Sequence, residues 1–587
     1  MGSGRASAVL RAARWLLPLA VPASCVVWTL LSFAPPTPPA LDAARRESFQ
    51  ASVGEIEIAG AAERRRDAVT PPVPRREGIV HASPRPPERQ EIIDTSPPPP
   101  ERRARAAETS PPPPPQHEQI VDASPPPKLE ENKGASPPPS PPPPRPARQE
   151  RQASAAKRAA VGDRCAGRYI YVQDLPGRFN ADLLRDCRSL SEWTDMCKHV
   201  ANAGMVPRLT RTGGVLPPAG WHDTNQFTLE VIFHGRMRQY GCLTADASRA
   251  AAVYVPYYAG LDVGRHLWGS SSNAARDALA EDLAAWLRAT PAWAARGGRD
   301  HFLVAGRIAW DFRRQDDGSS EWGSRLLLLP EAMNMTALVL ESGPWHAGDV
   351  GVPYPTYFHP SRAAEVDSWQ RGLRRARRPW LFAFAGARRP GGGEGGGGTL
   401  RDAVMDQCAR SRRCGLLQCG RRGRRDDCYA PGNVMRHLKS AAFCLQPPGD
   451  SYTRRSAFDA MLAGCVPVFF HPGSAYTQYR WHLPVDHAKY SVFIPGDGVR
   501  NGTVRVEDVL RRFGRAEVAA MREQVVRMIP GIVYRDPRRS PDSGFRDAFD
   551  IEVDGVIKRV GRIKRGLPPR EDDDGQRRWG GYFDVRW

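Results

Sequence analysis

AFCLQPPGDSYTRRSAFDAMLAGCVPVFFH, residues 442–471, is the stretch of sequence that decides the fold. A short apolar run leads into a Pro-Pro and Gly-Asp-Ser turn, then into apolar residues at helical spacing, and a second apolar run ends at Phe470. This order over about thirty residues is typical of one β-α-β unit. We expect Thr453 to cap the helix and Gly464 to end it.

Two arginines, Arg454 and Arg455, fall in the first turn of that helix. Because a helix N-terminus is already positive, each cation there costs roughly 0.3–1 kcal/mol unless an anion offsets it. Backbone N–H groups, two guanidinium groups and nearby hydroxyls together suit a diphosphate, and Asp459 suits a ribose. The alternative is a capped helix whose arginines point to solvent. The candidate donor-binding residues are Gly449, Asp450, Ser451, Thr453, Arg454, Arg455, Ser456 and Asp459.

The bulk composition limits the class of protein. With 587 residues the chain is too long for one core, which predicts two or three domains plus unstructured material. Its net charge of +20 suits anionic partners such as nucleotide-sugars, acidic polysaccharides or anionic lipids. Nucleic acid is a poor candidate, because the arginines are scattered and no nucleic-acid-binding motif occurs.

The N-terminus predicts the compartment. Residues 15–33 form an uncharged run of nineteen residues, just long enough to span a bilayer, and Arg5, Arg11 and Arg14 precede it. A basic N-terminal flank favours an amino end in the cytosol. We therefore expect a cytosolic tail (1–14) and a type II signal anchor (15–33), with the rest in the lumen. A cleaved signal peptide is the alternative.

Proline-rich tracts fill residues 34–160, where no core-forming pattern occurs. Proline runs hold polyproline II at about 3.1 Å per residue and do not collapse. We therefore expect a disordered, semi-rigid stem that lifts a globular head off the membrane.

Cysteine usage agrees with a secretory compartment. Ten cysteines lie beyond the predicted anchor, and an even number there predicts disulfides whose connectivity stays open. A zinc site between Cys408 and Cys428 is the alternative, although no CxxC pair occurs there. Sequons at Asn334 and Asn501 are usable only in the lumen.

Strand and helix patterns alternate through the globular part, which predicts a mostly parallel, doubly wound α/β architecture. We expect two lobes, 161–375 and 376–540, with a ligand cleft between them, and a segment 541–587 whose helix packs back on the first lobe before a tail. Strands are expected at 169–172, 251–255, from His301, and at 338–342, 381–387, 442–446, 466–470 and 491–495. Helices are expected within 228–242 and at 277–287, 432–440, 506–513, 518–528 and 545–563.

Several motifs resemble the plant exostosin family, and within it the xyloglucan galactosyltransferase branch. They are AGRYIYVQDLPGRFN, TNQFTLEVIFHGRMRQYGCLT, AVYVPYYAGLDV, DHFLVAGRIAWDFRR, PYPTYFHP and the extended stretch from Phe443 to Pro484. The resemblance covers about residues 163–565, and the last motif is long enough to be very specific.

The resemblance implies a GT-B fold, with two Rossmann-like lobes and a UDP-sugar held mainly by the C-terminal lobe. It also implies inversion at the anomeric carbon, residence in the Golgi membrane and no metal cofactor. In agreement with the last point, the only Asp-x-Asp motif (572–574) lies in an acidic tail. Protein cations must then neutralise the diphosphate leaving group. The implied partners are UDP-galactose, xyloglucan and other wall-polysaccharide transferases.

An inverting transfer needs one general base for the acceptor hydroxyl. The candidates at strand ends are Asp262, Asp311 and Glu341, with His301 as a further possibility. Trp268, Trp310, Tyr257, Tyr258 and Tyr354 are candidates for stacking on acceptor sugars. The same fold with UDP-galacturonic acid, UDP-arabinose or a mannan acceptor is one alternative, and a non-catalytic glycan-binding wall protein is another.

Overall fold

The computed structural model describes residues 163–583, apart from 206–207, 211, 269–270, 317–321, 389–398, 420–427, 429, 540–543 and 571–578. The described residues from Arg164 onward belong to one compact unit. The predicted cytosolic tail, signal anchor and stem lie outside the described residues, as does the Asp-x-Asp motif. Within the described part, no helix combines the length and apolarity needed to cross a bilayer.

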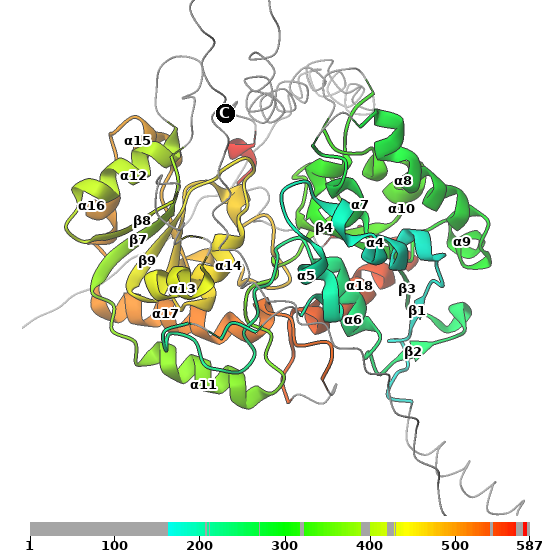
Figure 1. Cartoon of the computed structure of the whole chain (residues 1–587), viewed down its shortest axis with the longest axis horizontal. Helices are drawn as coiled ribbons and strands as arrows, with labels where there is room; N and C mark the ends of the chain where they lie inside the picture. Colours follow the sequence, from blue (N-terminus) through cyan, green and yellow to red (C-terminus); the bar gives the residue numbers. More distant parts are fainter. Residues whose placement is uncertain are drawn as a thin grey trace, which may run out of the picture. The chain divides into compact units, whose positions relative to one another are not determined.

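The first of two parallel sheets defines the N-terminal lobe (Figure 1), and its strand order is β2-β1-β3-β4-β5-β6. Its strands are β1 (Ile170–Val172), β2 (Leu243–Thr244), β3 (Ala252–Val255), β4 (His301–Ile308), β5 (Thr336–Glu341) and β6 (Asp349–Gly351). Every pairing in this sheet is parallel. The order reverses between β1 and β3, as in a doubly wound sheet.

The second sheet defines the C-terminal lobe, with the strand order β11-β10-β9-β7-β8 and again only parallel pairings. Its strands are β7 (Trp380–Gly386), β8 (Cys414–Gln418), β9 (Ala441–Gln446), β10 (Val466–Phe469) and β11 (Val492–Phe493). Here the order reverses between β7 and β9. In open α/β sheets, ligands bind beyond the carboxyl ends of the strands at such a reversal.

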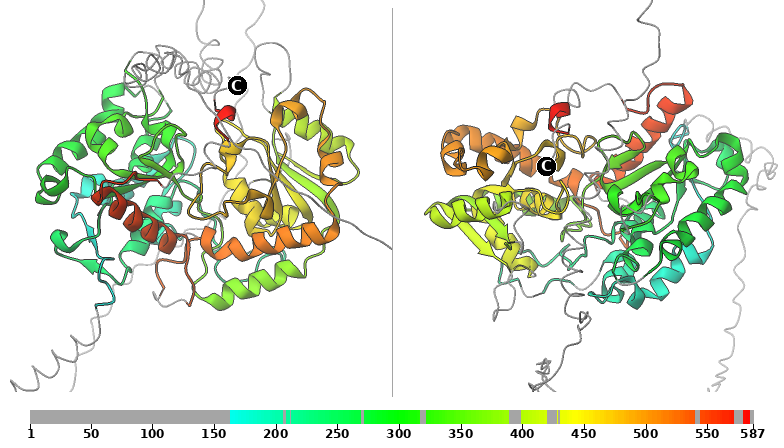
Figure 2. Two further views of the ribbon diagram at one scale, coloured as in Figure 1. Left: turned by 180° about the vertical axis from the view of Figure 1, so that it is seen from behind. Right: turned by 90° about the horizontal axis from the view of Figure 1, so that it is seen from above.

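Helices cover both faces of each sheet (Figures 1 and 2). They are α4 (Ala181–Arg185), α5 (Cys197–Val200), α6 (Leu229–Met237), α7 (Ala259–Gly264), α8 (Asn273–Arg288), α9 (Pro291–Arg296), α10 (Pro330–Asn334), α11 (Ala363–Arg374), α12 (Leu400–Arg410), α13 (Pro431–Lys439), α14 (Arg455–Leu462), α15 (Gly496–Arg500), α16 (Val506–Leu510), α17 (Arg515–Met528) and α18 (Ala548–Lys564). Alternate residues of β4 enter different cores, with Phe302 on the α6 side and Leu303 on the α8 side. The predicted doubly wound α/β architecture is therefore confirmed.

One hydrophobic core joins the two lobes. It includes Phe233 of α6 and Phe458 of α14, and also Phe549 of α18. Phe549 packs on Phe233 with ring centroids 4.8 Å apart. Both Oδ atoms of Asp547, which caps α18, accept 3.0 Å hydrogen bonds from the buried guanidinium of Arg236. Burial of this pair ties the C-terminal helix to the N-terminal lobe.

Some elements differ from the expectation. β8 lies in the cysteine-dense segment that showed no strand pattern, and three of its five residues are only partly buried. α11 was not expected, although its buried residues Val366, Trp369 and Leu373 recur at helical spacing. The strand expected at 491–495 shortens to Val492–Phe493. The helix expected at 506–513 ends at Leu510.

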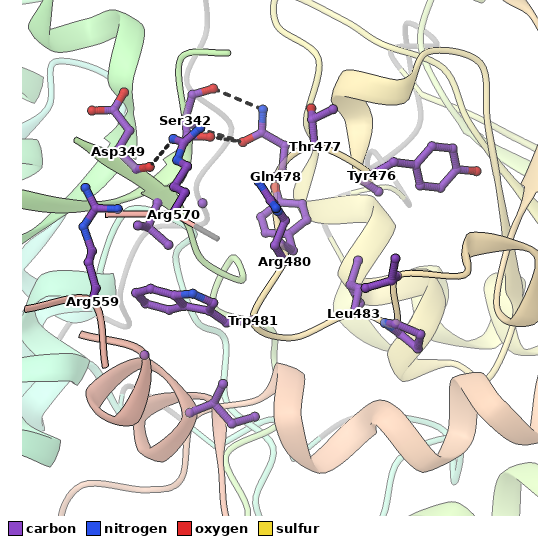
Figure 3. A pocket seen from close by; sticks show the side chains of 18 of the residues that line it. Ser342, Asp349, Tyr476, Thr477, Gln478, Arg480, Trp481, Leu483, Arg559 and Arg570 are labelled. Atoms are coloured by element: carbon purple, nitrogen blue, oxygen red, sulfur yellow. Dashed lines mark hydrogen bonds between the residues drawn. The ribbon is translucent and has the colours of Figure 1, made fainter. Parts of the chain in front are cut away.

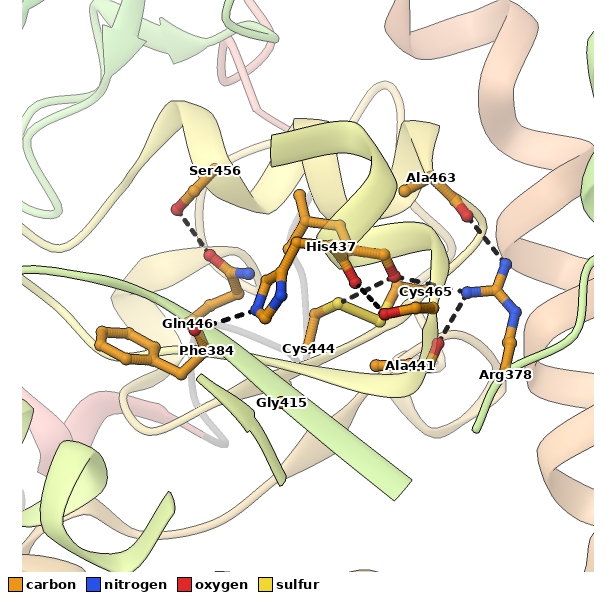
Figure 4. The surroundings of a disulfide bond; sticks show 12 residues. Arg378, Phe384, Gly415, His437, Ala441, Cys444, Gln446, Ser456, Ala463 and Cys465 are labelled. Carbon is orange, nitrogen blue, oxygen red and sulfur yellow. Dashed lines mark hydrogen bonds between the residues drawn. A yellow bond between two sulfur atoms is a disulfide. The ribbon is translucent and has the colours of Figure 1, made fainter. Parts of the chain in front are cut away.

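All ten cysteines beyond residue 33 form disulfides, so the predicted cross-linking is confirmed. The pairs are Cys165–Cys242, Cys187–Cys197, Cys408–Cys414, Cys419–Cys428 and Cys444–Cys465. The last pair joins β9 to the residue before β10 (Figure 4). Beside it, Arg378 donates to the carbonyl oxygens of Ala441 (2.6 Å) and Ala463 (2.8 Å). Gly464 follows α14 at φ 63°, as its predicted role as a helix terminator requires.

His359 lies in the segment after β6 and contacts the segment after α17. Its Nδ1 lies 2.8 Å from the carbonyl oxygen of Tyr534, and its Nε2 lies 2.8 Å from Oγ1 of Thr224. The carbonyl needs a proton on Nδ1, so Nε2 accepts from the hydroxyl. Burial, aided by His222, lowers the pKa of His359 to about 3.

This lowered pKa makes His359 a site of acid sensitivity. Because the unfolded chain binds the proton more readily, the stabilisation from neutral His359 is present above pH 6.5 and is lost as the pH falls below it. We expect wild type to exceed His359→Gln in unfolding free energy at pH 7. That difference should shrink by about 2 kcal/mol between pH 6.5 and pH 5. Chemical denaturation of both proteins across this range measures it, and a difference that does not change with pH would contradict the assignment.

Candidate functional site

The GDSYT loop (449–453) leaves the carboxyl end of β9, one of the two strands at which the C-terminal sheet reverses. It ends at α14, whose N-cap is Arg454 and whose cap makes no side-chain hydrogen bond. The prediction that Thr453 caps this helix is therefore wrong. Its hydroxyl instead donates to a carboxylate of the other lobe, which leaves the first N–H groups of α14 without a side-chain cap.

Arg454 lies against the backbone of Gly449. A Cβ built on Gly449 would be 0.8 Å from Nη2 of Arg454, so only glycine leaves room for this guanidinium. Gly449 has no left-handed φ, so backbone conformation makes no demand for glycine here. Nη2 lies 3.6 Å from Oδ2 of Asp450, and the Arg454 side chain is 29% exposed. A cation thus lies at the start of α14, in reach of solvent.

Arg455 has different surroundings. Its Nη1 donates to the carbonyl oxygen of Thr224 (2.6 Å), and its guanidinium stacks on the ring of Tyr357 at 3.7 Å. Its Nε lies 3.4 Å from Oδ2 of Asp459. These contacts fix Arg455 between α14 and the N-terminal lobe. Whether both arginines face one diphosphate stays a prediction, and for Arg455 these contacts with the other lobe already engage Nη1 and the ring face of the guanidinium.

The other residues predicted to bind the sugar donor also form two groups: some bond residues outside the loop, and the rest lie together in the loop. Asp459 is 4% exposed, faces Arg455, and burial raises its pKa to about 6 despite the guanidinium. Asp459 thus lies in a buried ion pair, and its role as the ribose-binding residue stays a prediction. Ser456 donates to Oε1 of Gln446 at the end of β9 (2.6 Å). Gly449, Asp450, Ser451, Thr453 and Arg454 remain together in the loop.

Glu341, the last residue of β5, connects the N-terminal lobe to this loop. Its Oε2 accepts from the backbone N–H (2.8 Å) and the hydroxyl (2.7 Å) of Thr453. The Ser451 side chain also bonds it, and the Tyr354 hydroxyl lies 3.1 Å from Oγ1 of Thr453. Burial raises the pKa of Glu341, and these hydrogen bonds oppose the shift. The structure therefore brings this candidate base onto the GDSYT loop (449–453), which we call the donor loop. Most of the hydrogen bonds that its carboxylate can accept are already formed.

Asp311 lies in the 3₁₀ turn Ala309–Phe312 that follows β4. Its Oδ1 accepts from the indole N–H of Trp322 (2.9 Å), and its Oδ2 lies 3.5 Å from Nη1 of Arg307. Burial raises the pKa of Asp311. Asp311 also lies close enough to Tyr354 to help raise the pKa of that phenol, after burial and the charge of Glu341. Tyr354 in turn contacts the donor loop.

Asp262 lies inside α7 and has no described contact with the donor loop. Its Oδ2 accepts from the hydroxyl of Tyr257 (2.6 Å), and its Oδ1 pairs with Arg265. The carboxylate is 3% exposed, and burial raises its pKa. His301 at the start of β4 is fully buried, and its Nδ1 lies 2.9 Å from Oδ1 of Asp300. Both residues have partners that suit a structural role.

Aromatic residues that the sequence reasoning missed cover the other side of the loop. Tyr452 stacks on His471 with ring centroids 4.5 Å apart, and Phe583 near the C-terminus contacts both rings. Burial lowers the pKa of His471 to about 4. The available signal was the position of His471 directly after the buried run that ends at Phe470. The contact with Phe583 has no sequence signal.

A separate cavity of about 780 Å³ lies between β6, α18 and residues 475–490, and no residue of the donor loop lines it (Figure 3). Gln478 closes one side through hydrogen bonds to Ser342, whose N–H donates to Oε1 at 2.7 Å. Basic residues outnumber acidic ones in its lining. Burial, aided by the charge of Arg570, lowers the pKa of Arg559 to about 10. Within the described residues, no three His, Cys, Asp or Glu side chains gather as a metal site would require.

Comparison with known proteins gives a consistent picture. The sequence profile described as "Exostosin GT47 domain" matches residues 164–510. Two curated relatives are from Arabidopsis thaliana. "Xyloglucan galactosyltransferase MUR3" is 51% identical over 405 residues, which cover 69% of this chain and 64% of that protein. "Probable xyloglucan galactosyltransferase GT12" is 47% identical over 421 residues, 70% of this chain and 81% of that protein.

A third relative is named for the transfer of a different sugar. "Xyloglucan-specific galacturonosyltransferase 1" of Arabidopsis thaliana is 40% identical over 400 residues, 68% of this chain and 58% of that protein. Matches to this and to the first relative thus span less than two thirds of their lengths. Among solved structures, "Spinosyn Rhamnosyltransferase SpnG" has a TM-score of 0.26 and 12% identity, with 63% of this chain and 97% of that chain covered. We draw no conclusion about this chain from a similarity this low.

Proposed function

The chain belongs to the exostosin GT47 family, and from this premise we propose that it is an inverting glycosyltransferase that transfers β-galactose from UDP-galactose to xylosyl side chains of xyloglucan. The observation that carries the proposal is the position of Arg454. Its guanidinium lies at the start of α14, against the backbone of Gly449 and beyond the carboxyl end of β9. A diphosphate placed there meets a cation and uncapped helix N–H groups.

We assign the donor to the C-terminal lobe of a GT-B arrangement. Two doubly wound sheets joined by a common core are compatible with this assignment. Glu341 holds the donor loop from the N-terminal lobe through Thr453. This carboxylate is a positioning group, since its hydrogen bonds are directed at the loop.

We assign the general base to Asp311. Burial raises its pKa, which makes it a stronger acceptor of protons, and its lobe carries the expected acceptor site. In the transfer, the acceptor oxygen forms a bond to the anomeric carbon as the bond to the UDP oxygen breaks. Asp311 takes the hydroxyl proton, and UDP leaves with the bonding electron pair. Arg454 offsets the charge that develops on the diphosphate.

We further propose that transfer requires no metal cofactor and occurs in the Golgi lumen, with the chain held by residues 15–33 as a single-pass type II anchor. Arg454 and the N–H groups of α14 supply the positive charge that a metal ion supplies to a diphosphate elsewhere. The uncharged run and its basic flank support the anchor. Protease protection of tagged Golgi vesicles tests it: the lumenal C-terminus should survive until detergent is added.

Donor, acceptor and metal requirement can be tested together. We expect the purified full-length protein to transfer galactose from a panel of UDP-sugars onto xyloglucan oligosaccharide lacking galactose, at a rate that EDTA leaves unchanged. Loss of transfer on chelation, with recovery on added Mn²⁺, would contradict the metal-free mechanism. Transfer of galacturonic acid or arabinose instead, or transfer onto mannan, would change the substrate and keep the reaction class. Binding of glycan without transfer from any donor would make the chain a glycan-binding protein.

A further inference from the structure

Three tryptophans form a connected row on the N-terminal lobe. Trp193 is 60% exposed, Trp268 is 37% exposed and Trp322 is partly buried. The ring centroids of Trp193 and Trp268 are 6.5 Å apart, those of Trp268 and Trp322 are 5.2 Å apart, and both pairs meet edge to face. Exposed apolar side chains that gather in this way, rather than singly, mark binding surfaces.

The scaffold holds this row in place from three separate segments. Trp193 lies in the short loop closed by the Cys187–Cys197 disulfide. Trp268 follows α7, and Trp322 lies near the 3₁₀ turn that carries Asp311. Indole side chains have few rotatable bonds, so they give a large contact area at low cost in conformational entropy. A fixed row of this kind is suited to a rigid ligand.

The inner end of the row reaches the proposed base. The indole N–H of Trp322 donates to Oδ1 of Asp311 at 2.9 Å. Asp311 in turn lies within electrostatic range of Tyr354, whose hydroxyl is 3.1 Å from Thr453 in the donor loop. Asp311 is therefore linked to the donor loop by its charge, which acts on Tyr354, and to the row of rings by its hydrogen bond with Trp322. A ligand lying on those rings extends away from the reacting carboxylate.

We propose that Trp193, Trp268 and Trp322 are the platform that holds the β-linked glucan backbone of the acceptor polysaccharide, which stacks on the ring faces turned toward it and contacts the edges of the perpendicular neighbours. This assignment rests on the proposed function, because it names the acceptor class of the same site. Pyranose rings in a β-linked chain present C–H groups on their flat faces, and the negative faces of indole rings attract them. A neutral glucan needs such contacts, since it carries no charge for the cations that line the cavity beside β6.

The test is the effect of Trp193→Ala and Trp268→Ala on acceptor binding. Each variant is expected to raise the KM for xyloglucan oligosaccharide about tenfold, and to leave the KM for UDP-galactose and the kcat at saturating acceptor close to wild type. Trp380→Ala is the matched control, because Trp380 is also 37% exposed but begins β7 in the C-terminal lobe. It should change none of these constants. Thermal melts check that each variant is folded.

Binding without donor separates this inference from the proposed function. In affinity gel electrophoresis, xyloglucan in the gel should retard wild type and Trp380→Ala, and should retard Trp193→Ala and Trp268→Ala less. Glucan binding that depends on these rings would support the platform even if no galactose were transferred. Galactose transfer with an unchanged acceptor KM in both folded variants would overturn the platform and leave the function standing. Absence of retardation of wild type in the xyloglucan gel would also overturn it.

Discussion

Arg454→Ala is expected to lower kcat/KM for UDP-galactose by about 10²–10³-fold while the protein remains folded. The guanidinium offsets charge that develops on the leaving diphosphate, so its loss affects the transition state more than the fold. Its side chain is 29% exposed, so truncation leaves no large cavity. Arg454→Lys keeps the charge but loses the planar fork that matches a diphosphate, and should recover part of the activity. Steady-state kinetics and UDP titration calorimetry measure both effects.

Two further variants make this experiment specific. Gly449→Ala should reproduce the loss, because the new Cβ would occupy the place of Nη2 of Arg454. In an Arg454→Ala background, the same change should add little, which a double-mutant cycle reports. Arg374→Ala is the matched control, since this arginine of α11 is 39% exposed and pairs with Glu523 on the surface. Unchanged UDP affinity in folded Arg454→Ala would refute the donor site.

Asp311→Asn is expected to lower kcat by about 10²–10⁴-fold with little change in the KM values. The amide keeps the size of the carboxylate and still accepts from the indole N–H of Trp322, but it cannot take a proton from the acceptor hydroxyl. Because burial raises the pKa of Asp311, wild-type kcat/KM should also fall as the pH drops through that pKa. Asp311→Asn should lose this acidic limb. Initial rates from pH 4 to pH 8, at saturating substrates for kcat and at subsaturating acceptor for kcat/KM, measure both effects.

The other candidate carboxylates supply the comparison. Asp262→Asn should lower stability, because it weakens the buried contacts with Tyr257 and Arg265, while the folded enzyme keeps its kcat. Glu341→Gln should raise the KM for the donor, because Glu341 holds the loop through Thr453. Full kcat in Asp311→Asn, with the loss found in Glu341→Gln instead, would transfer the role of base to Glu341.

Much of the architecture could be predicted from local sequence. The expected strands at 169–172, 251–255 and 466–470 match β1, β3 and β10 within a residue, since each is an apolar run bounded by turn residues. β8 was missed because its pattern is weak, since three of its five residues are only partly buried. α11 was missed although Val366, Trp369 and Leu373 recur at helical spacing. Disulfide pairing also had no local signal, because it depends on which segments meet in space.

The candidate site was predicted in part. The sequence located the GDSYTRR segment at a helix start, and the structure confirms that α14 begins at Arg455. It gave no reason to treat the two arginines differently. Only the fold shows that Arg454 lies on Gly449 while Arg455 binds the carbonyl of Thr224 in the other lobe. The same holds for Thr453 and Glu341, which are more than a hundred residues apart along the chain yet share a hydrogen bond.

The sequence by itself determined the alternation of strands and helices, the family and the loop that carries the cation. Periodicity and turn chemistry depend on neighbouring residues, so they can be read along the chain. The tertiary structure alone decided which side chains share the site: Arg454 with Gly449, Glu341 with Thr453, and Asp311 with Trp322. Such contacts arise where the carboxyl ends of strands from two sheets meet, and the packing of the common core, which no local pattern encodes, sets that meeting.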